Sequence, residues 1–300
     1  MNTIAQSPER TQAIMKYRSY RQFHKQIRRT ARRLGFPLRV MFELTYRCNF
    51  KCPHCYVPAA YRKYPELKTK DVFSILDQLK AIGCLYLGFT GGEPFLRKDL
   101  MEILHYARKS GFEVIIYTNG SLINEKGAKQ LGQIGLNKVD VTIPAMSREA
   151  FERISGLPGS RNRVFKAIEL LRKNRVSLGF KSCLLRQNKG EIKEIEDFAA
   201  SLQALHRLGD VLLPRLDGSK APFRYQVRLK GKTEAATAKP KPSSGCGAGL
   251  SQAAITPGGE LKICLMIERP RYPILKTSLK DAWEKLKKSK IEGNHDSCPL

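Results

Sequence analysis

Residues Cys48-Asn49-Phe50-Lys51-Cys52-Pro53-His54-Cys55 place three cysteines on one short segment with the spacing C-x3-C-x2-C. Three thiolates can bind three irons of a [4Fe–4S] cluster, whereas an electron-transfer cluster usually takes four cysteines. The fourth iron then has no protein ligand, and an open position on a metal is where substrate chemistry takes place. The alternative is a zinc site, which usually recruits a second Cys or His pair at short range. The segment therefore favours an enzyme over an electron carrier.

Strand and helix patterns alternate along the chain from this segment onward. Apolar periodicity and Gly stop signals separate the two kinds of element. The predicted strands are Arg39–Thr45, Leu85–Phe89, Glu113–Thr118, Lys138–Ile143, Ser177–Leu185 and Asp210–Leu213. The predicted helices between them are Thr69–Ile82, Lys98–Ser110, Asn124–Ile134, Arg161–Asn174 and Gly190–Leu205. Such βα units in series imply an α/β fold with a parallel sheet, curved into a partial (β/α)6 TIM-like barrel.

Polar motifs follow the first three predicted strands. The cysteine segment follows the first strand, Thr90-Gly91-Gly92-Glu93-Pro94 follows the second, and Thr118-Asn119-Gly120 ends the third. Because the carboxyl ends of barrel strands form the active face, these motifs are expected to meet there. A Gly-Gly-Glu-Pro or Thr-Asn-Gly run by itself is only a turn, so their shared placement carries the argument.

With these motifs the chain resembles the radical SAM superfamily, whose C-x3-C-x-Φ-C motif is matched with His54 at the Φ position. The resemblance implies that S-adenosylmethionine (SAM) chelates the open iron. It also implies that one electron from a flavodoxin- or ferredoxin-type donor cleaves SAM to a 5′-deoxyadenosyl radical.

The resemblance also assigns roles to the other motifs. Gly91, Gly92 and Glu93 match the motif that meets the methionine amino group, while Thr118 and Asn119 match the end of the third strand that contacts ribose and methionine. After the fourth strand many relatives carry Ser-Leu-Asp-Gly. Here the run is Val141-Thr142-Ile143-Pro144-Ala145, without the acid. The sequence singles out no catalytic acid or base.

A second cysteine pattern lies near the C-terminus. Cys246, Gly259 and Cys264 resemble the opening of the SPASM and twitch domains, and Cys298 falls where their next ligand is expected. The resemblance implies an auxiliary [4Fe–4S] cluster, and the alternative is buried thiols or zinc. Since the chain stops at Leu300, either the module is cut short or this cluster has three cysteine ligands.

Composition shifts divide the chain into four predicted parts. Residues 1–35 form a basic extension with an amphipathic helix over 16–34, and residues 36–230 form the barrel. Residues 231–245 are a linker, and residues 246–300 are the auxiliary-cluster module. The basic helix is expected either to lie on the barrel or to contact an acidic partner or a membrane surface.

The overall composition limits the location of the protein. No apolar run is long enough for a membrane span, and no signal-peptide core opens the sequence. Eight cysteines without a secretion signal favour ligated metal or reduced thiols in the cytoplasm. Cys84 and Cys183, inside apolar strands, are expected to pack in the core. The net charge of +27 favours acidic partners.

The favoured function is radical modification of a peptide or protein side chain, because relatives with a SPASM domain commonly mature peptides or sulfatases. The first alternative is oxidation or rearrangement of a small molecule, such as an aminosugar or a tetrapyrrole. The second is a non-catalytic iron–sulfur protein or a basic nucleic-acid-binding protein.

Overall fold

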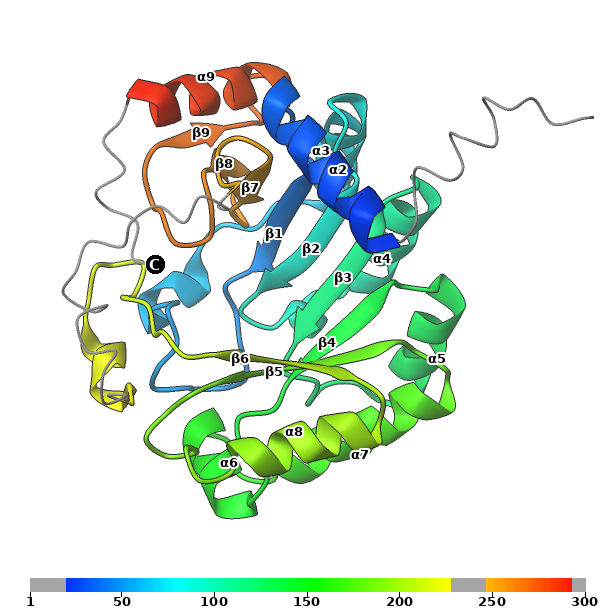
Figure 1. The fold of residues 1–300 in the computed structure, drawn as a ribbon, viewed down its shortest axis with the longest axis vertical. Coiled ribbons are helices and arrows are strands. Elements are labelled where there is room, and N and C mark those ends of the chain that lie inside the picture. Colours follow the sequence, from blue (N-terminus) through cyan, green and yellow to red (C-terminus); the bar gives the residue numbers. More distant parts are fainter. Residues whose placement is uncertain (1–19, 228–246, 293–300) are drawn as a thin grey trace, which may run out of the picture.

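The computed structural model describes residues 20–227 and 247–292. Within these ranges the strands form one nine-stranded sheet in the order β6-β5-β4-β3-β2-β1-β7-β8-β9. The pairs from β6 through β1 to β7 are parallel, and β7-β8-β9 pair antiparallel. Figure 1 shows the parallel part as a curved sheet with helices along its outside, as in an open barrel. The predicted fold class is therefore confirmed.

The strand bounds follow the chain order. They are β1 (Arg39–Thr45), β2 (Tyr86–Gly91), β3 (Glu113–Thr118), β4 (Lys138–Thr142), β5 (Leu178–Cys183), β6 (Leu205–Gly209), β7 (Gln252–Ile255), β8 (Glu260–Lys262) and β9 (Arg271–Pro273).

The α-helices mostly cover the outer face of the sheet. They are α2 (Tyr20–Leu34), α3 (Thr69–Ala81), α4 (Leu100–Lys109), α5 (Glu125–Ile134), α6 (Arg148–Ser155), α7 (Ser160–Lys173), α8 (Ile192–Ser201) and α9 (Leu279–Glu292). Three short 3-10 helices, η1 (Ala59–Lys63), η2 (Pro94–Leu96) and η3 (Ala221–Tyr225), lie in connections.

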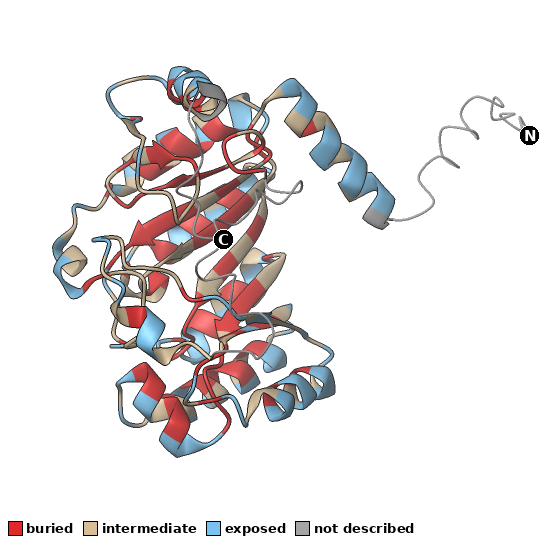
Figure 2. Cartoon of the chain, turned by 60° about the vertical axis from the view of Figure 1, so that its left-hand side comes forward, coloured by how far each residue is buried: buried red, intermediate tan, exposed pale blue. Residues whose placement is uncertain are grey.

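Alternate residues of each strand face the two sides of the sheet. Val40 and Phe42 of β1 are fully buried in the hydrophobic core. Arg39 and Met41 instead line a cavity on the concave face. Figure 2 shows the strands largely buried and the outer helix faces exposed. The concave face therefore carries the polar side chains, and the outer face holds the core.

Most predicted elements are confirmed within one or two residues, but the sixth unit is wrong. The helix predicted to reach Leu205 ends at Ser201, and Gln203 has a left-handed φ of 52°. The strand is Leu205–Gly209, not Asp210–Leu213. Because β6 is an edge strand that includes His206 and Arg207, it lacks the apolar pattern that marks a buried strand. The prediction followed the apolar run beyond it.

Helix α6 is absent from the prediction, although its start has a clear signal. Ser147 accepts a hydrogen bond from the backbone N–H of Ala150 at 3.3 Å, as an N-cap does. Gly156 ends the helix in the left-handed conformation. The helix occupies the connection between β4 and α7.

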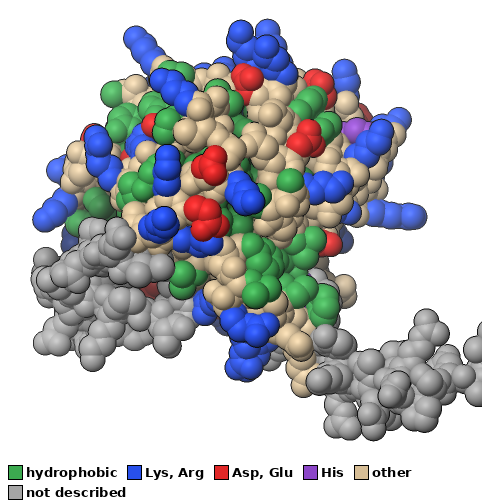
Figure 3. All heavy atoms as spheres, turned by 90° about the horizontal axis from the view of Figure 1, so that it is seen from above, with side chains coloured by type: hydrophobic (Ala, Val, Ile, Leu, Met, Phe, Trp, Pro, Cys, Tyr) green, Lys and Arg blue, Asp and Glu red, His purple; other side chains and the backbone are tan. Residues whose placement is uncertain are grey.

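The basic N-terminal helix is confirmed over Tyr20–Leu34, and residues 16–19 lie outside the described part. Its Ala31 is fully buried, and the His24 Nδ1 and Tyr86 hydroxyl lie 2.6 Å apart. These contacts place α2 on the barrel, while most of its surface stays exposed (Figure 2). Figure 3 shows many Lys and Arg side chains (blue) on the visible part of one face, with apolar (green) and acidic (red) side chains among them. No described helix is long and apolar enough to cross a membrane.

The described part of the predicted C-terminal module continues the barrel sheet. β7 pairs in parallel with β1, from Arg39 opposite Gln252 to Phe42 opposite Ile255. β8 pairs antiparallel with β7, so the two strands form a hairpin. The last helix, α9, follows, and its Trp283 Nε1–H donates to the Gly35 carbonyl oxygen at 2.7 Å.

A buried ion pair fixes β8 to β1. Lys262 and Glu43 are both fully buried, with Nζ and Oε2 3.5 Å apart. The Glu43 carboxylate also accepts hydrogen bonds from the hydroxyls of Tyr46 (2.9 Å) and Tyr56 (2.8 Å). Burial raises the pKa of Glu43, and Lys262 opposes that rise. Lys262 therefore compensates a carboxylate that water does not reach.

The Lys262→Met variant should lose about 3–5 kcal/mol of unfolding free energy, because it leaves Glu43 buried without its cation. Denaturant unfolding of the apoprotein measures the loss. The double variant Glu43→Gln/Lys262→Met should lose less than the single variant, since no unpaired charge remains. A double variant as unstable as Lys262→Met would show that packing, not charge, causes the loss.

Candidate functional site

The three sequence motifs meet at the carboxyl ends of β1, β2 and β3. These strands are neighbours in the sheet, with β2 in the centre. The cysteine loop, residues 48–55, follows β1 after Thr45, the Gly-Gly-Glu turn ends β2, and Asn119 follows β3. The structure thus brings the predicted residues of the barrel together at one edge.

The Gly-Gly-Glu turn lies directly against the backbone that leads into the cysteine loop. The Gly92 N–H donates to the Thr45 carbonyl at 2.7 Å, and the Glu93 N–H donates to the Arg47 carbonyl at 2.8 Å. A Cβ on Gly91 would lie 2.1 Å from the Thr45 oxygen, and one on Gly92 would lie 2.2 Å from the Arg47 oxygen. Gly91 also has a φ of +137°. Only glycine fits this contact.

The Glu93 side chain connects the turn to the end of β3. It is fully buried, and its carboxylate accepts hydrogen bonds from the Thr118 hydroxyl (2.7 Å), the Asn119 N–H (2.7 Å) and the Phe95 N–H (3.1 Å). Burial raises the pKa of Glu93 to about 7, and the three donors oppose that rise. The carboxylate therefore holds Thr118 and Asn119 in place at the end of β3.

Asn119 in turn connects β3 to the cysteine loop. Its Nδ2 donates to Asn49 Oδ1 at 2.9 Å, and its Oδ1 accepts from the Ser121 hydroxyl at 2.7 Å. Asn49 Nδ2 donates to the Ser121 hydroxyl at 2.8 Å, which closes a ring of three side chains. Asn119 Nδ2 also lies 4.0 Å from Cys48 Sγ. The sequence does not indicate a role for Asn49 or Ser121, because the two residues lie on separate loops and meet only in the folded chain.

The three thiols of the cysteine loop are free and partly buried. Burial raises the pKa of Cys48 to about 11 and also raises the pKa values of Cys52 and Cys55. Repulsion from the other thiols of the loop also raises the pKa values of Cys48 and Cys52, whereas Arg62 lowers those of Cys48 and Cys55. A bound cation would remove this cost, since a coordinating thiol is deprotonated. The donor set thus fits a cluster with three protein ligands.

No three Cys, His, Asp or Glu side chains converge on a single ion-sized point in the described ranges. A single zinc would need thiolates about 2.3 Å from one ion. This finding applies to zinc and to cluster ligands alike in residues 20–227 and 247–292.

His54 lies between Cys52 and Cys55 with its ring mostly buried. Burial lowers the pKa of His54 to about 4, which keeps the imidazole neutral at pH 7. Its Nδ1 has no hydrogen-bond partner within the part of the chain that the structure describes. The structure places His54 in the loop without showing what it binds.

Residues from the C-terminal half close around the cysteine loop. The Leu216 N–H donates to the Tyr56 carbonyl at 2.9 Å, and Arg215 lowers the pKa of Cys55. Tyr56 shares a small cavity of about 20 Å³ with Leu265 and Met266, which follow Cys264. Cys264 is partly buried, while Cys246 and Cys298 lie outside the described residues.

Cys183 is a further thiol near the loop. It ends β5, and its thiol, when ionised, raises the pKa values of Cys52 and Cys55. It is packed against the core, as predicted, but at the site rather than away from it. Its position at a strand's carboxyl end was the available signal. Cys84, at the opposite end of the sheet, is buried as predicted.

The Gly92→Ala variant should lose about 1–3 kcal/mol of unfolding free energy, because its Cβ would overlap the Arg47 backbone. The Gly190→Ala variant is the matched control, since a Cβ there meets nothing within 4 Å. Denaturant unfolding of both variants is the measurement. Equal stability of the two variants would contradict the close contact between turn and loop.

The Glu93 carboxyl should make stability fall as pH rises. Its pKa is about 7 in the folded chain and 4.5 when exposed, so its contribution is complete below pH 4.5 and lost as pH passes 7. The loss is about 3 kcal/mol. The lowered pKa of His54 makes the unfolding free energy rise with pH, which opposes the effect of Glu93. The test therefore compares the wild-type apoprotein with the Glu93→Gln apoprotein, since both contain His54. The unfolding free energy of the wild type relative to that of Glu93→Gln should fall from pH 4.5 to 7. A difference that stays constant over this range would contradict the raised pKa of Glu93.

Known proteins share both the sequence pattern and the fold. Residues 42–199 match the Radical SAM superfamily. The chain is 34% identical over 159 residues to Fe-coproporphyrin III synthase of Methanosarcina barkeri (strain Fusaro / DSM 804), covering 53% of this chain and 40% of the relative. It is 32% identical over 169 residues to PqqA peptide cyclase of Gluconobacter oxydans (strain 621H), covering 56% and 47%. The chain thus spans less than half of these relatives.

Solved structures extend the likeness of fold beyond the matched region. Streptococcus suis SuiB has a TM-score of 0.67 at 17% identity, covering 87% of this chain and 69% of SuiB. The anSMEcpe structure with bound AdoMet and Cp18Cys peptide has a TM-score of 0.66 at 19% identity, covering 84% of this chain and 82% of that one. The superfamily match spans more than half of the chain and includes the cysteine loop, the Gly-Gly-Glu turn and the β3 end. The chain belongs to the radical SAM superfamily, whose members use a [4Fe–4S] cluster and SAM.

Proposed function

We propose that this chain cleaves SAM reductively and modifies a peptide or protein side chain. The observation that carries the radical chemistry is the connection of the three-cysteine loop to the Gly-Gly-Glu turn and the β3 end through backbone and side-chain hydrogen bonds. The peptide class is supported by the similarity to PqqA peptide cyclases, at 29–32% identity.

Each part of the site has a proposed task. Cys48, Cys52 and Cys55 hold the catalytic cluster, and His54 shields it within the loop. Gly91, Gly92 and Glu93 form the wall that meets the SAM methionine, and Thr118 and Asn119 offer it hydrogen-bonding groups. When bound, the cluster and SAM supply a 5′-deoxyadenosyl radical that abstracts a substrate hydrogen.

The residues of the chain orient these groups and exclude water. Glu93 fixes Thr118 and Asn119 through two hydrogen bonds, so neither has to be ordered when SAM binds. The Leu216–Tyr56 contact covers the cysteine loop from the side of β6. The three thiols are partly buried, which limits the access of solvent to the reacting centre.

The C-terminal part is proposed as a SPASM or twitch module, with Cys246, Cys264 and Cys298 as ligands of an auxiliary [4Fe–4S] cluster. Cys264 follows β8, which the buried Lys262–Glu43 pair fixes to β1. Since Glu43 also binds the Tyr56 hydroxyl, one hydrogen-bonded path joins the two cysteine sites. The proposed parts remain 1–35, 36–230, 231–245 and 246–300, with a flavodoxin- or ferredoxin-type electron donor and an acidic partner for α2.

A tetrapyrrole is the second candidate substrate. It is favoured by the 34% identity to Fe-coproporphyrin III synthase and by 30% identity over 166 residues to AdoMet-dependent heme synthase of Oleidesulfovibrio alaskensis. This candidate uses the same cluster loop and SAM wall. The two candidates differ only in the molecule that lies on the concave face.

Anaerobically reconstituted, reduced protein should convert SAM to 5′-deoxyadenosine, and the Cys52→Ala variant should not, because it lacks one of three cluster ligands. Cys84→Ala is the matched control, since Cys84 is buried at the start of β2, far from the loop. Liquid chromatography with mass detection measures the product. Absence of cleavage in wild type, beside an active reference enzyme, would overturn the radical assignment.

Iron content separates one cluster from two. We expect about eight irons per chain after reconstitution, and about four in the Cys264→Ala variant. The variant should still cleave SAM, since Cys48, Cys52 and Cys55 are unchanged. An unaltered iron content in Cys264→Ala would refute the auxiliary ligand assignment.

A further inference from the structure

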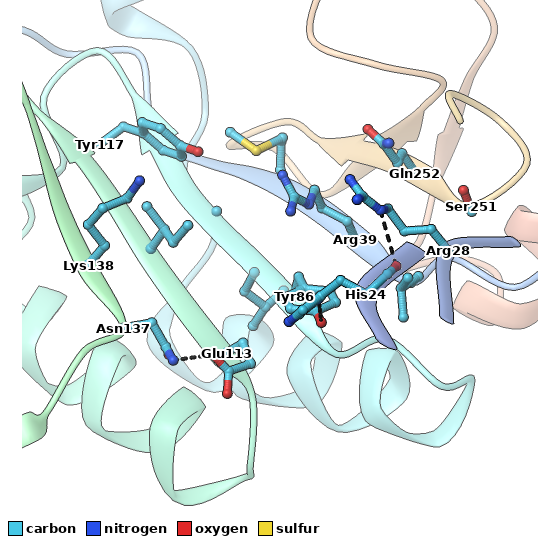
Figure 4. Close-up of a pocket in the computed structure, with 15 residues that line it drawn as sticks. His24, Arg28, Arg39, Tyr86, Glu113, Tyr117, Asn137, Lys138, Ser251 and Gln252 are labelled. Atoms are coloured by element: carbon cyan, nitrogen blue, oxygen red, sulfur yellow. Dashed lines mark hydrogen bonds between the residues drawn. The ribbon is translucent and has the colours of Figure 1, made fainter. Parts of the chain in front are cut away.

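A cavity of about 400 Å³ lies between α2 and the concave face of the sheet. Its walls come from α2, from the amino-terminal halves of β1, β2 and β4, from β3 as far as Tyr117, and from the start of β7 (Figure 4). It therefore lies toward the amino ends of the strands. The cysteine loop and the Gly-Gly-Glu turn lie at the carboxyl ends, so the cavity is separate from the site described above.

Three cations line this cavity. Arg39 and Lys138 extend from the sheet and Arg28 from α2, and Figure 4 shows them around the same space. The lining acid is Glu113, whose carboxylate accepts a hydrogen bond from Asn137 Nδ2. Within the described residues, neither Arg28 nor Arg39 forms an ion pair with an acid; the Arg39 guanidinium lies 5.5 Å from the Tyr86 ring centre. The cavity thus has a cationic excess.

The neighbouring concave face increases that excess. One carboxylate, that of Asp140, pairs with two cations: Lys138, at 3.5 Å, and Arg207. Lys181 and Arg207 lie 6.0 and 5.8 Å from the Tyr117 ring centre. Burial is the largest cause that lowers the pKa of Lys138, and repulsion from Arg207 and Arg39 lowers it further. An anion in the cavity would relieve this repulsion.

The remaining lining determines which anion fits. Met41, Ile115 and the ring of Tyr117 make part of the wall apolar. A carboxylate on a short hydrocarbon stem would place its stem on these groups and its oxygens on the guanidinium and ammonium groups. Gly88 keeps this space open, because a Cβ there would lie 2.5 Å from Met41 Sδ and 3.1 Å from the Tyr117 ring.

The cavity also lies on the path to the reaction site. Gly88 precedes Gly92 by four residues on β2, which corresponds to about 13 Å along a strand. Tyr117 directly precedes Thr118 on β3. A molecule anchored in the cavity would therefore extend along the concave face toward the carboxyl ends of the strands.

We propose that this cavity binds a carboxylate of the substrate, with Arg39 and Lys138 as its partners and Arg28 closing it from α2. The proposal rests on the proposed function for the fate of the anchored molecule. It makes Arg39 and Lys138 specificity-determining residues for an acidic substrate.

Binding to the full chain, measured by isothermal titration calorimetry without reductant, tests the proposal independently of SAM cleavage. One probe is the blocked pentapeptide Ala-Glu-Leu-Glu-Ala, matched with Ala-Gln-Leu-Gln-Ala. The other probe is coproporphyrin III, matched with its tetramethyl ester. At least one acid should bind about tenfold or more tighter than its neutral match. The arm that succeeds distinguishes a peptide from a tetrapyrrole carboxylate.

Variants locate the binding. Arg39→Gln and Lys138→Gln should each weaken acid binding about tenfold or more. Lys129→Gln, an exposed cation on α5, removes the same charge elsewhere and should have little effect. Ile115→Trp should weaken binding by filling the cavity without changing charge. Inorganic phosphate should compete more weakly than the acid probe.

Several results would overturn the proposal: no binding of either acid, equal binding of acid and neutral probes, equal losses in Lys129→Gln and Arg39→Gln, or stronger binding of phosphate. Should Arg39→Gln fail to fold, Lys138→Gln carries the same test. Acid binding without any SAM cleavage would instead refute the proposed function and leave the cavity assignment standing.

Discussion

The site depends on one close contact between two backbones. The Gly91-Gly92-Glu93 turn donates two N–H groups to carbonyls of Thr45 and Arg47, at a separation that leaves no room for a side chain. This contact fixes the end of β2 to the entry of the cysteine loop. Glu93 then extends the constraint to β3, and Asn119 returns it to the loop through Asn49 and Ser121. Hydrogen bonds thereby connect three separate sequence motifs into one continuous surface.

The two ends of the parallel strands carry different kinds of side chain. Carboxyl ends of the strands carry the thiols and the wall beside them, whereas amino ends and the concave face carry cations. The sheet also continues past β1 into β7 and β8, so the cysteine-bearing hairpin is held in the same structure as the barrel. The buried Lys262–Glu43 pair fixes that hairpin, and Glu43 holds Tyr56 beside Cys55. The proposed auxiliary site is thus anchored close to the loop.

Much of this could be predicted from sequence because the chemistry follows strand ends. The cysteine spacing, the Gly-Gly-Glu turn and Thr118-Asn119 are contiguous motifs, and six βα units imply where they meet. Contacts between distant segments gave no such signal. Glycine is required at 91 and 92 because the carbonyl oxygens of Thr45 and Arg47 lie too close for a side chain. The cation that pairs with Glu43 lies far along the chain, on β8. The cationic cavity takes single residues from several strands, so no local pattern shows it. Strand β6 was misplaced because an exposed edge needs no apolar run.

In the proposed site, three thiolates leave one iron open for SAM. Pulsed electron–nuclear spectroscopy on the reduced cluster, with SAM labelled with ¹⁵N at its amino group, would detect the bond between them. We expect a ¹⁵N hyperfine coupling to the cluster of the wild-type protein. A reduced [4Fe–4S] signal with SAM bound but no ¹⁵N coupling would contradict it.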